Sequence, residues 1–391
     1  MDALTTPLNW QRVRLGDIAE IKRGVRITKN ELDVFGKYPV VSGGVGFLGY
    51  TNNFNRYENT ITIAQYGTAG YVNFQKNKFW ANDICFCVYH NKDVIKNIFL
   101  YYFLKVNQNY LYEISNRNAT PYSISKDKIL DFEILLPPLN EQIAIANILS
   151  DVDHYLYSLD ALILKKESVK KALSFELLSQ RKRLKGFNQN WQRVRLGDIG
   201  ITISGLAGKT KQDFINGNAK YITFLNVLNN VIIDTSILEN VKIYPNEKQN
   251  SFKKYDLFFN TSSETPKEVG MCAVLLDDID QVFLNSFCFG FRIFDKAVDS
   301  LFLSYLINSE IGRKAFENLA QGSTRYNLSK SGFNNVCLIL PPLNEQIAIA
   351  NILSGLDHEI ISLKNKKRQF DNIKKALNHD LMSAKIRVLK K

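Results

Sequence analysis

The sequence predicts an α+β protein made of two tandem halves, each with a mixed α/β domain followed by a long helix. The first observation is that the run NWQRVRLGDI at Asn9–Ile18 recurs without change at Asn190–Ile199. The second is that LPPLNEQIAIANILS, at Leu136–Ser150, recurs at Leu340–Ser354. The third is the heptad spacing of apolar residues after each LPPLNEQ run. Because the segments between the runs differ, we expect identical frames around divergent domains. The expected boundaries are 1–136, a first domain; 137–186, a first helix; 187–340, a second domain; and 341–391, a second helix.

A helix should begin just after each Pro-Pro pair. Asn140 is a good N-cap, and Glu141 suits the positive end of the helix dipole. Apolar residues then recur every seven positions, with a flanking track beside them, for about four to five heptads, which favours a coiled coil. The two tracks are Ile145, Val152, Leu159, Leu173 and Leu149, Leu156, Ile163, Leu177 in the first half, and Ile349, Leu356, Leu363, Phe370, Leu377 and Leu353, Ile360, Leu381 in the second.

Each helix needs a partner for its apolar seam, and the simplest partner is the other helix. At about 45 residues each would be about 65–70 Å long. An antiparallel pair would place the two domains at opposite ends of a rod, related by a pseudo-two-fold axis. Lys166 interrupts the first seam, and its stem can pack while its charge reaches the rim.

The two domains should share a fold although their middle parts differ. Thr60–Ala64 and Lys220–Phe224 alternate as strands do, whereas 95–106 and 301–312 are typical of short helices. Glycines 43, 44, 46 and 49 indicate turns. Each domain ends on a related string, TPYSISK at 120–126 and TRYNLSK at 324–330, which predicts the same local structure in both halves.

Composition indicates a globular protein with real cores and no membrane span. The chain has 391 residues, 45% of them hydrophobic, which leaves room for two or three domains. The start at Met1–Leu4 has neither the basic residues nor the apolar stretch of a signal peptide, and no apolar run approaches about 20 residues. The five cysteines lie in apolar runs without CxxC spacing, so we expect reduced, buried thiols and a cytoplasmic location.

The net charge of +12 is concentrated after the LPPLNEQ runs. Between Ala161 and Gly186 there are eight Lys or Arg against two Glu, and between Ile361 and Lys391 there are ten against two Asp. Such faces are either solvated helix surfaces or binding surfaces for phosphate or an acidic partner. Charge alone does not decide between these two interpretations.

Motifs for catalysis or cofactor binding are absent from the sequence. The GxGxxG match at Gly44–Gly49 is followed by polar residues rather than a helix, so it does not indicate a dinucleotide site. Gly208-Lys209-Thr210 lacks the first glycine of a P-loop, because Ile203 stands at that position. There is no Asn/Asp-Pro-Pro-Tyr/Phe string, and the four histidines have no metal spacing. We therefore expect no catalysis by this chain alone and no cofactor.

Two long helices that each begin at LPPLNEQ, each preceded by a variable α/β domain beginning at W-x-x-x-x-L-G-D, resemble the specificity (S) subunit of type I restriction-modification enzymes. The resemblance covers nearly the whole chain. It implies that each insert is a target recognition domain that reads one half of a split double-stranded DNA site. It also implies helices that act as spacers and dock two methyltransferase (M) subunits, which bind S-adenosylmethionine, with restriction (R) subunits joining that core.

Polar residues in the predicted loops are the candidate DNA contacts, because Arg can read guanine and Asn can read adenine. They are Lys22, Arg23, Arg26, Tyr66, Thr68, Arg117, Asn118 and Tyr122 in the first domain, and Lys209, Lys211, Thr261, Ser262, Ser263, Arg325 and Asn327 in the second.

The candidate methyltransferase-docking residues are those of the duplicated turns, Asn140, Glu141, Gln142, Asn344, Glu345 and Gln346. The competing role of these turns is to cap the helices and to pack on their own domains.

Three other classes of protein stay open at this point. One is the specificity chain of a related system that cuts on both sides of its target, and another is a scaffold with two ligand-binding modules on a coiled coil. The third is a stand-alone transferase. A gel shift of the chain with and without a methyltransferase partner separates these classes.

Overall fold

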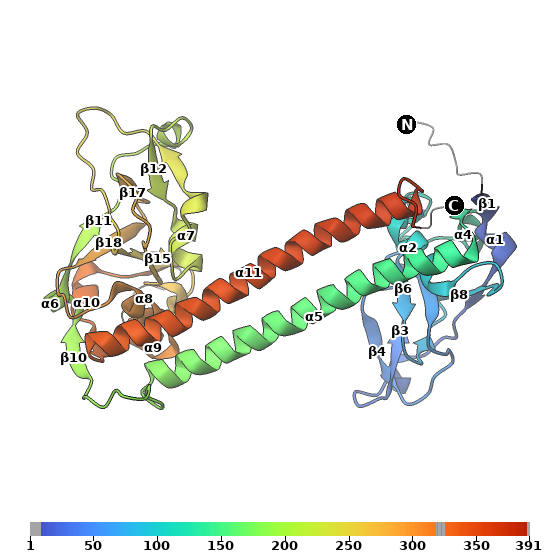
Figure 1. Cartoon of the computed structure of the whole chain (residues 1–391), viewed down its shortest axis with the longest axis horizontal. Coiled ribbons are helices and arrows are strands. Elements are labelled where there is room, and N and C mark those ends of the chain that lie inside the picture. Colours follow the sequence, from blue (N-terminus) through green and yellow to red (C-terminus); the bar gives the residue numbers. More distant parts are fainter. Residues whose placement is uncertain (1–8, 318, 320–321, 323–324, 389–391) are drawn as a thin grey trace. The chain divides into compact units, whose positions relative to one another are not determined.

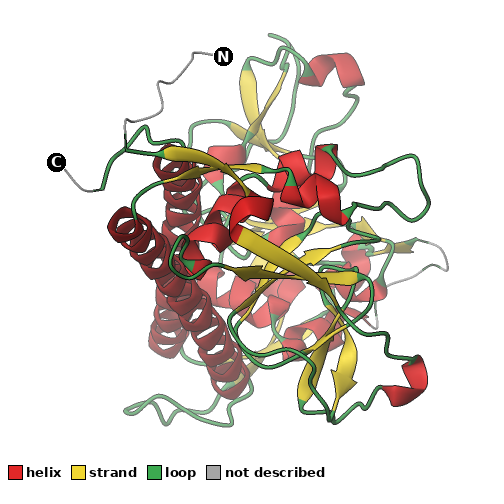
Figure 2. Ribbon diagram, turned by 90° about the vertical axis from the view of Figure 1, so that its right-hand side faces the viewer, coloured by secondary structure: helices red, strands yellow, loops and turns green. Residues whose placement is uncertain are grey.

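The computed structural model describes residues 9–317, 319, 322 and 325–388. By internal contacts the chain forms two units, one of Met1–Ala161 with Asn365–Lys391 and the other of Leu162–Lys364. Each unit contains one domain of mixed strands and short helices, together with parts of both long helices (Figures 1 and 2). The α+β fold class is therefore confirmed. Met1–Leu4, which we expected not to form a signal peptide, and Thr324 of the second duplicated string lie outside the described residues.

The first domain has a four-stranded sheet, a three-stranded sheet and a two-stranded ribbon. The four-stranded sheet has the order β2 (Ala19–Arg23), β8 (Cys85–His90), β5 (Thr60–Ala64), β6 (Val72–Gln75). The three-stranded sheet has the order β4 (Phe47–Thr51), β3 (Tyr38–Val41), β7 (Trp80–Ala81), and the ribbon pairs β1 (Gln11–Arg14) with β9 (Glu133–Leu136). Its helices are α1 (Leu15–Ile18), α2 (Asn97–Val106), α3 (Gln108–Glu113) and α4 (Lys126–Leu130).

The second domain repeats this topology strand for strand. Its four-stranded sheet has the order β11 (Gly200–Ser204), β18 (Cys288–Ile293), β14 (Leu257–Asn260), β16 (Cys272–Val274). Its three-stranded sheet is β13 (Glu239–Val241), β12 (Ala219–Ile222), β17 (Val282–Leu284), and its ribbon pairs β10 (Gln192–Arg195) with β20 (Cys337–Leu340). A further pair joins β15 (Ser262–Ser263) to β19 (Tyr326–Asn327), and the helices are α6 (Leu196–Ile199), α7 (Phe224–Asn229), α8 (Ser300–Asn308), α9 (Glu310–Glu317) and α10 (Lys330–Asn334).

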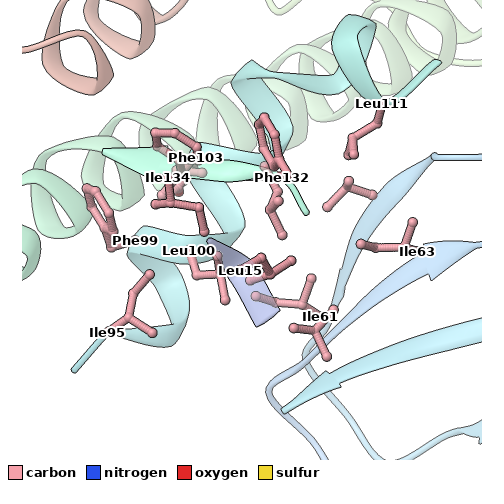
Figure 3. Close-up of a cluster of buried hydrophobic side chains, with 14 of the residues drawn as sticks. Leu15, Ile61, Ile63, Ile95, Phe99, Leu100, Phe103, Leu111, Phe132 and Ile134 are labelled. Atoms are coloured by element: carbon pink, nitrogen blue, oxygen red, sulfur yellow. The ribbon is translucent and has the colours of Figure 1, made fainter. Parts of the chain in front are cut away.

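The core of the first domain is apolar and closed by its helices. Figure 3 shows Phe99, Leu100 and Phe103 of α2 facing Ile61 and Ile63 of β5 through a shared cluster of side chains. The same cluster includes the first turns of the long helix that follows, through Ile145 and Leu149, and Leu381 and Met382 from the end of the other long helix. The start of one long helix and the end of the other are thus part of this core.

The two long helices are α5 (Leu139–Leu178) and α11 (Leu343–Met382), each of 40 residues, slightly shorter than expected. Within the first unit Lys367 pairs with Asp160 at 2.7 Å, and Lys374 pairs with Asp153. Within the second unit Lys166 pairs with Glu359 at 2.8 Å, and Lys170 pairs with Asp357. In both units, higher numbers on one helix meet lower numbers on the other, so the pairing is antiparallel, as predicted (Figure 1).

The seam residues do not all lie between the two helices. Ile145 and Leu149, like Ile349 and Leu353, are buried in the domain cores, because the first turns of each helix pack on their own domain. Further along the helices Leu159 is buried, whereas Leu363 is half-buried. Lys166 is half-buried and its ammonium reaches Glu359, which agrees with a packed stem and a charge at the rim.

Several local expectations are corrected. Asn140 is not the N-cap: the helix begins at Leu139, and the Pro138 carbonyl accepts the amides of Glu141 and Gln142 at 2.9 and 3.0 Å. The predicted strand 220–224 ends at Ile222, because the Thr223 side chain caps α7 by accepting the Asn226 amide.

The predicted helix 301–312 is instead two helices. Ser309 is extended, and its hydroxyl accepts the Gly312 amide at 3.3 Å, which ends α8 and starts α9. The helix expected at 95–106 begins two residues later, at Asn97. Gly49 lies in β4 rather than in a turn, and Cys337 is only partly buried, unlike the other four cysteines.

Candidate nucleic-acid interface

A strand edge in the first domain brings five of the eight predicted contacts together. The Gly67 amide donates to the Tyr122 carbonyl at 3.0 Å, and Tyr66 forms a β-bridge with Ser123. Thr68 binds the Gly43 carbonyl through both its amide and its hydroxyl, at 2.9 and 2.7 Å. The duplicated string TPYSISK therefore lies against the segment that follows β5. Tyr66, Thr68, Arg117, Asn118 and Tyr122 are the predicted residues that meet there.

Arg117 is held in place by two aromatic rings at this edge. Its guanidinium carbon lies 5.5 Å from the ring centre of Tyr112 and 5.3 Å from that of Tyr122, and its Nε donates to the Tyr112 carbonyl at 3.1 Å. Stacking of this kind leaves the remaining guanidinium N–H groups free to face a ligand. Arg117 is exposed, so it presents a positioned cation to solvent.

Arg23 supplies a second positioned cation. It is the last residue of β2, and its Nε and Nη2 both donate to Gln65 Oε1, at 2.8 and 2.7 Å. Gln65 was not predicted from the sequence, because a glutamine between two loop residues carries no distinguishing pattern. The structure shows that it lies directly beside Tyr66 and orients Arg23.

A shallow hollow of about 630 Å³ adjoins this edge, lined by small and apolar residues of the glycine-rich loop, the Tyr66–Thr68 turn, Ile84 and Pro121. Gly43 is required there, since a Cβ atom would lie 2.3 Å from the Tyr66 carbonyl oxygen. Gly67 has a positive φ of 77°. The glycines thus let two backbone segments approach closely.

Two predicted residues of the first domain lie apart from this cluster. Lys22 lies next to Arg23 on β2 and therefore points to the other face, where it pairs with Glu20 at 3.1 Å and lies over the Tyr89 ring. Arg26 is exposed in the loop after β2. Neither belongs to the strand edge that carries Tyr66.

The second domain forms the same edge with different side chains. Ser262 and Ser263 pair with Asn327 and Tyr326, and the Leu328 amide donates to the Thr261 carbonyl at 2.8 Å, as Ile124 does to Gln65 at 2.9 Å. Five of the seven predicted residues therefore meet here: Thr261, Ser262, Ser263, Arg325 and Asn327.

Not all five residues of this second edge are presented to solvent. Ser262 and Ser263 are buried, and the Ser263 hydroxyl donates to Glu268 at 2.8 Å. Arg325 and Asn327 are exposed. The Arg325 guanidinium lies 5.7 Å from the ring centre of Phe287, an exposed aromatic residue that was not predicted from the sequence.

Lys209 is occupied by a structural ion pair. Its ammonium lies 2.5 Å from Glu247 and 2.6 Å from the Lys242 carbonyl, and its side chain is only 5% exposed. The Lys209 hydrogen bond, followed by those from Gln249 and the Tyr244 amide, lowers the pKa of Glu247 to about 2. Lys211, by contrast, is exposed at the start of a 3₁₀ turn. Lys209 therefore forms its contacts within its own loop region, with Glu247 and the Lys242 carbonyl.

The Glu and Gln of the predicted docking turns are buried. Glu141 accepts from Trp10 Nε1 at 3.1 Å and from Arg387 Nε and Nη2 at 2.6 and 2.8 Å. Gln142 donates to the Val94 and Pro137 carbonyls and accepts the Lys96 amide. These contacts explain why both side chains are fixed within the fold.

Glu345 and Gln346 repeat these contacts in the second unit. Glu345 accepts from Trp191 Nε1 at 3.3 Å and from Arg183 at 3.0 and 2.5 Å. Gln346 accepts the Asp299 amide at 2.9 Å and donates to the Ala297 and Pro341 carbonyls. We call each Glu with its Trp and Arg partners a clamp. The Trp and Arg of each clamp were not identified from the sequence as partners of the Glu, because they are far away along the chain.

The remaining members of the turns, Asn140 and Asn344, are exposed and begin a stripe along each long helix. At helical spacing it continues through Ile143, Asn147 and His154 on α5, all exposed. The equivalent residues on α11 are identical and also exposed: Ile347, Asn351 and His358. We call these two rows the outer stripes.

A second duplicated network ties each domain to its long helices. Tyr102 donates to Asp153 at 2.7 Å, and Asp153 pairs with Lys374. In the second unit Tyr305 donates to Asp357 at 2.7 Å, and Asp357 pairs with Lys170. Burial and then the hydrogen bond to Asp357 raise the pKa of Tyr305, so this phenol stays protonated.

Within the described residues there is no cluster of three or more His, Cys, Asp or Glu that could hold a metal ion. The same part of the chain contains no helix long and apolar enough to cross a membrane.

Two domains of one topology, each with a positioned cation on a variable strand edge and each followed by a long helix that begins with an identical run, define a tandem two-domain protein built on a repeated frame. The chain belongs to the type I restriction modification DNA specificity domain family, which it matches over residues 7–166 and 188–370. This confirms the resemblance drawn from the LPPLNEQ and W-x-x-x-x-L-G-D runs.

Individual relatives agree with this assignment. The type I restriction enzyme MjaVIII specificity subunit of Methanocaldococcus jannaschii is 27% identical, over 99% of this chain and 95% of that protein. A putative type I specificity subunit of Mycoplasma genitalium is 29% identical over 56% of this chain and 59% of its own length. The crystal structure of a type I restriction-modification S subunit from M. genitalium has the same fold, with a TM-score of 0.69 at 20% identity and 97% coverage of both chains.

Proposed function

We propose that this chain is the DNA-recognition subunit of a type I restriction-modification complex, and that each domain reads one half of a bipartite, asymmetric target. The observation that carries the proposal is that the runs before and after each domain are identical in sequence, whereas the strand edges that present the candidate contacts differ. Residues 65–68 are Gln-Tyr-Gly-Thr, whereas the segment at the same place in the second domain, 261–264, is Thr-Ser-Ser-Glu. Sequence is read by side chains at base edges, so two different edges on one scaffold suit two different half-sites.

The proposed DNA contacts are the exposed members of the two edges. Arg23, Arg117 and Tyr122 in the first domain and Arg325 and Asn327 in the second combine exposure with an anchored position. Lys22 and Lys209 are weaker candidates, since each is already paired with an acid. Arg26, Lys211 and Asn118 are proposed as phosphate or peripheral contacts on their exposure alone.

We infer that the outer stripes dock two methyltransferase subunits. Identity is expected at buried positions of a duplicated helix, but exposed residues such as Ile143 and Ile347 are free to diverge unless an external surface constrains both. Two copies of one partner would impose that constraint. The partner would supply the S-adenosylmethionine site and the methylation chemistry, and restriction subunits would join through it, while this chain contributes target choice.

A domain exchange tests the reading function. Residues 19–135 are replaced by the equivalent segment of another family member, and methylated motifs are sequenced in a host that carries the chain and its methyltransferase. We expect one half-site to change while the other half-site and the gap stay the same. A change in both half-sites would overturn the model of independent readers.

A length change tests the helices as spacers. Four residues are inserted into α5 within 161–171 and four at the facing position of α11, so that the antiparallel pairing is retained. Each helix becomes about 6 Å longer, which is nearly two base-pair steps of about 3.4 Å. We expect a longer gap in the methylated motif, and an unchanged gap would count against the helices as the ruler.

A further inference from the structure

The end of β2 in the first domain and the end of β11 in the second are the same place in the fold. Arg23 lies opposite Phe86 in the first sheet, and Ser204 lies opposite Phe289 in the second. The carbonyl of each end residue accepts a side-chain donor, Arg56 at 2.6 Å in one domain and Asn250 at 3.0 Å in the other. The comparison between these two positions is therefore fixed by backbone pairing rather than by sequence similarity.

The first domain delivers a cation to this place from the strand itself. Arg23 extends across Gln65, whose backbone carbonyl holds the duplicated string through Ile124. The second domain has Ser204 and Thr261 at the equivalent positions, so neither residue carries a charge.

A lysine from another element fills the same place in the second domain. Lys330, the first residue of α10, extends its ammonium to Ser204 Oγ at 2.6 Å. Within the described part of the chain neither Arg23 nor Lys330 forms an ion pair, and both are exposed. Both charges are thus held by neutral oxygen acceptors and stay available to an anion.

We propose that Lys330 is a DNA-contact residue of the second domain and that it binds a backbone phosphate at the place where Arg23 binds one in the first. The two domains retain the charge and its location, but they differ in the shape of the cationic group and in the element that carries it. A base edge would require the forked geometry of arginine, whereas a phosphate requires chiefly a positive charge. This inference rests on the proposed DNA-reading function.

The matched control is Lys126, which stands at the position of Lys330 in the duplicated string TPYSISK. Lys126 also begins a short helix, α4, and is exposed. Arg23 already occupies the site in that domain, so removing Lys126 should have little effect. The two substitutions Lys330→Met and Lys126→Met therefore remove the same charge from equivalent positions with different expected results.

The experiment measures the affinity of the full chain, bound to its methyltransferase, for DNA that carries the methylated motif, over a range of salt concentrations. Lys330→Met should weaken binding on the order of tenfold, reduce the salt slope by about 0.9, and leave the methylated motif unchanged. Lys126→Met should keep the wild-type slope. Adding Ser204→Arg and Thr261→Gln to Lys330→Met rebuilds the arrangement of the first domain and should restore both affinity and slope.

Three outcomes would overturn the assignment of Lys330. One is an unchanged slope in Lys330→Met, another is an equal loss in Lys126→Met, and the third is an altered motif in the second half-site, which would make Lys330 a base reader. Failure of the proposed function looks different, because the wild-type complex itself would then show no preference for the motif. Retained circular dichroism and melting temperature in each variant exclude loss of folding as the cause.

Discussion

The clamp on Glu141 should be essential for the stability of the first unit. Glu141→Ala removes the acceptor of the Trp10 indole N–H, a donor that is buried, and an unpaired buried donor costs about 1–3 kcal/mol. Arg387 loses two bonds as well, but its side chain is 31% exposed and can turn to water, so its loss adds less than about 1 kcal/mol. We expect a total destabilisation of about 1–4 kcal/mol.

Urea unfolding followed by tryptophan fluorescence measures this cost. Glu141→Gln keeps one acceptor oxygen for Trp10 and replaces the other oxygen, which faces Arg387, by an NH2 donor. It should lose only about 1 kcal/mol, because Arg387 can turn to water. Glu133→Ala is the matched control, because Glu133 pairs with Arg12 at 3.5 Å with both side chains well exposed, and it should cost under about 0.5 kcal/mol. If Glu141→Ala unfolded at the same urea concentration as Glu133→Ala, the Glu141 contacts would contribute nothing to the free energy of unfolding, and the argument from burial would be wrong.

Three further outcomes are expected. Arg325→Ala should weaken DNA binding by roughly 1–3 kcal/mol if the guanidinium reads a base edge. Gel shifts with cognate and mismatched DNA measure this loss, and a variant with the affinity and the sequence preference of the wild type would contradict that role. Ile143→Asp should leave a complex with one methyltransferase in native mass spectrometry, as should Ile347→Asp alone, whereas two bound copies in either variant would exclude the outer stripes. The pKa of Glu247 is lowered to about 2, so its ion pair stabilises the folded state above pH about 4.5 and this contribution is lost as pH falls toward 2. The stability difference between wild type and Glu247→Gln should therefore shrink from pH 5 to pH 2 in urea titrations, and a constant difference would contradict the pairing.

The sequence predicts the frame of this protein better than its contacts. Duplication and heptad spacing can be recognised in the order of the residues alone, so the two domains, the long helices and their antiparallel pairing could be predicted directly. Local competition was harder to predict: the cap formed by Thr223 ended a strand that alternation alone would have continued through Phe224. Ser309 broke a helix for the same reason, since its hydroxyl satisfies the amide of the next helix.

The sequence indicates which residue types could contact DNA, but it does not indicate which of these side chains are already paired within the fold. Arg117 and Arg325 were chosen as loop cations, and their exposure agrees with that choice. Lys209 belongs to the same chemical type, yet Glu247 lies 38 positions away in the sequence and neutralises it. Burial of Glu141 could not be foreseen either, because its partner Arg387 is 246 positions away. Long-range pairing decides which polar side chains remain available, and no local pattern encodes it.

The first unit combines two segments that are far apart in the sequence, and this has a consequence for biosynthesis. Its core contains Leu381 and Met382, and Glu141 is bound by Arg387, so residues 9–161 lack part of their packing until residues 365–387 have been made. The second unit, 162–364, is continuous in sequence and contains both partners of its own clamp. On the ribosome the second unit can therefore complete its fold before the first, which has to wait for residues 365–391, and a chain truncated before residue 365 would leave the first domain open to chaperones and proteases.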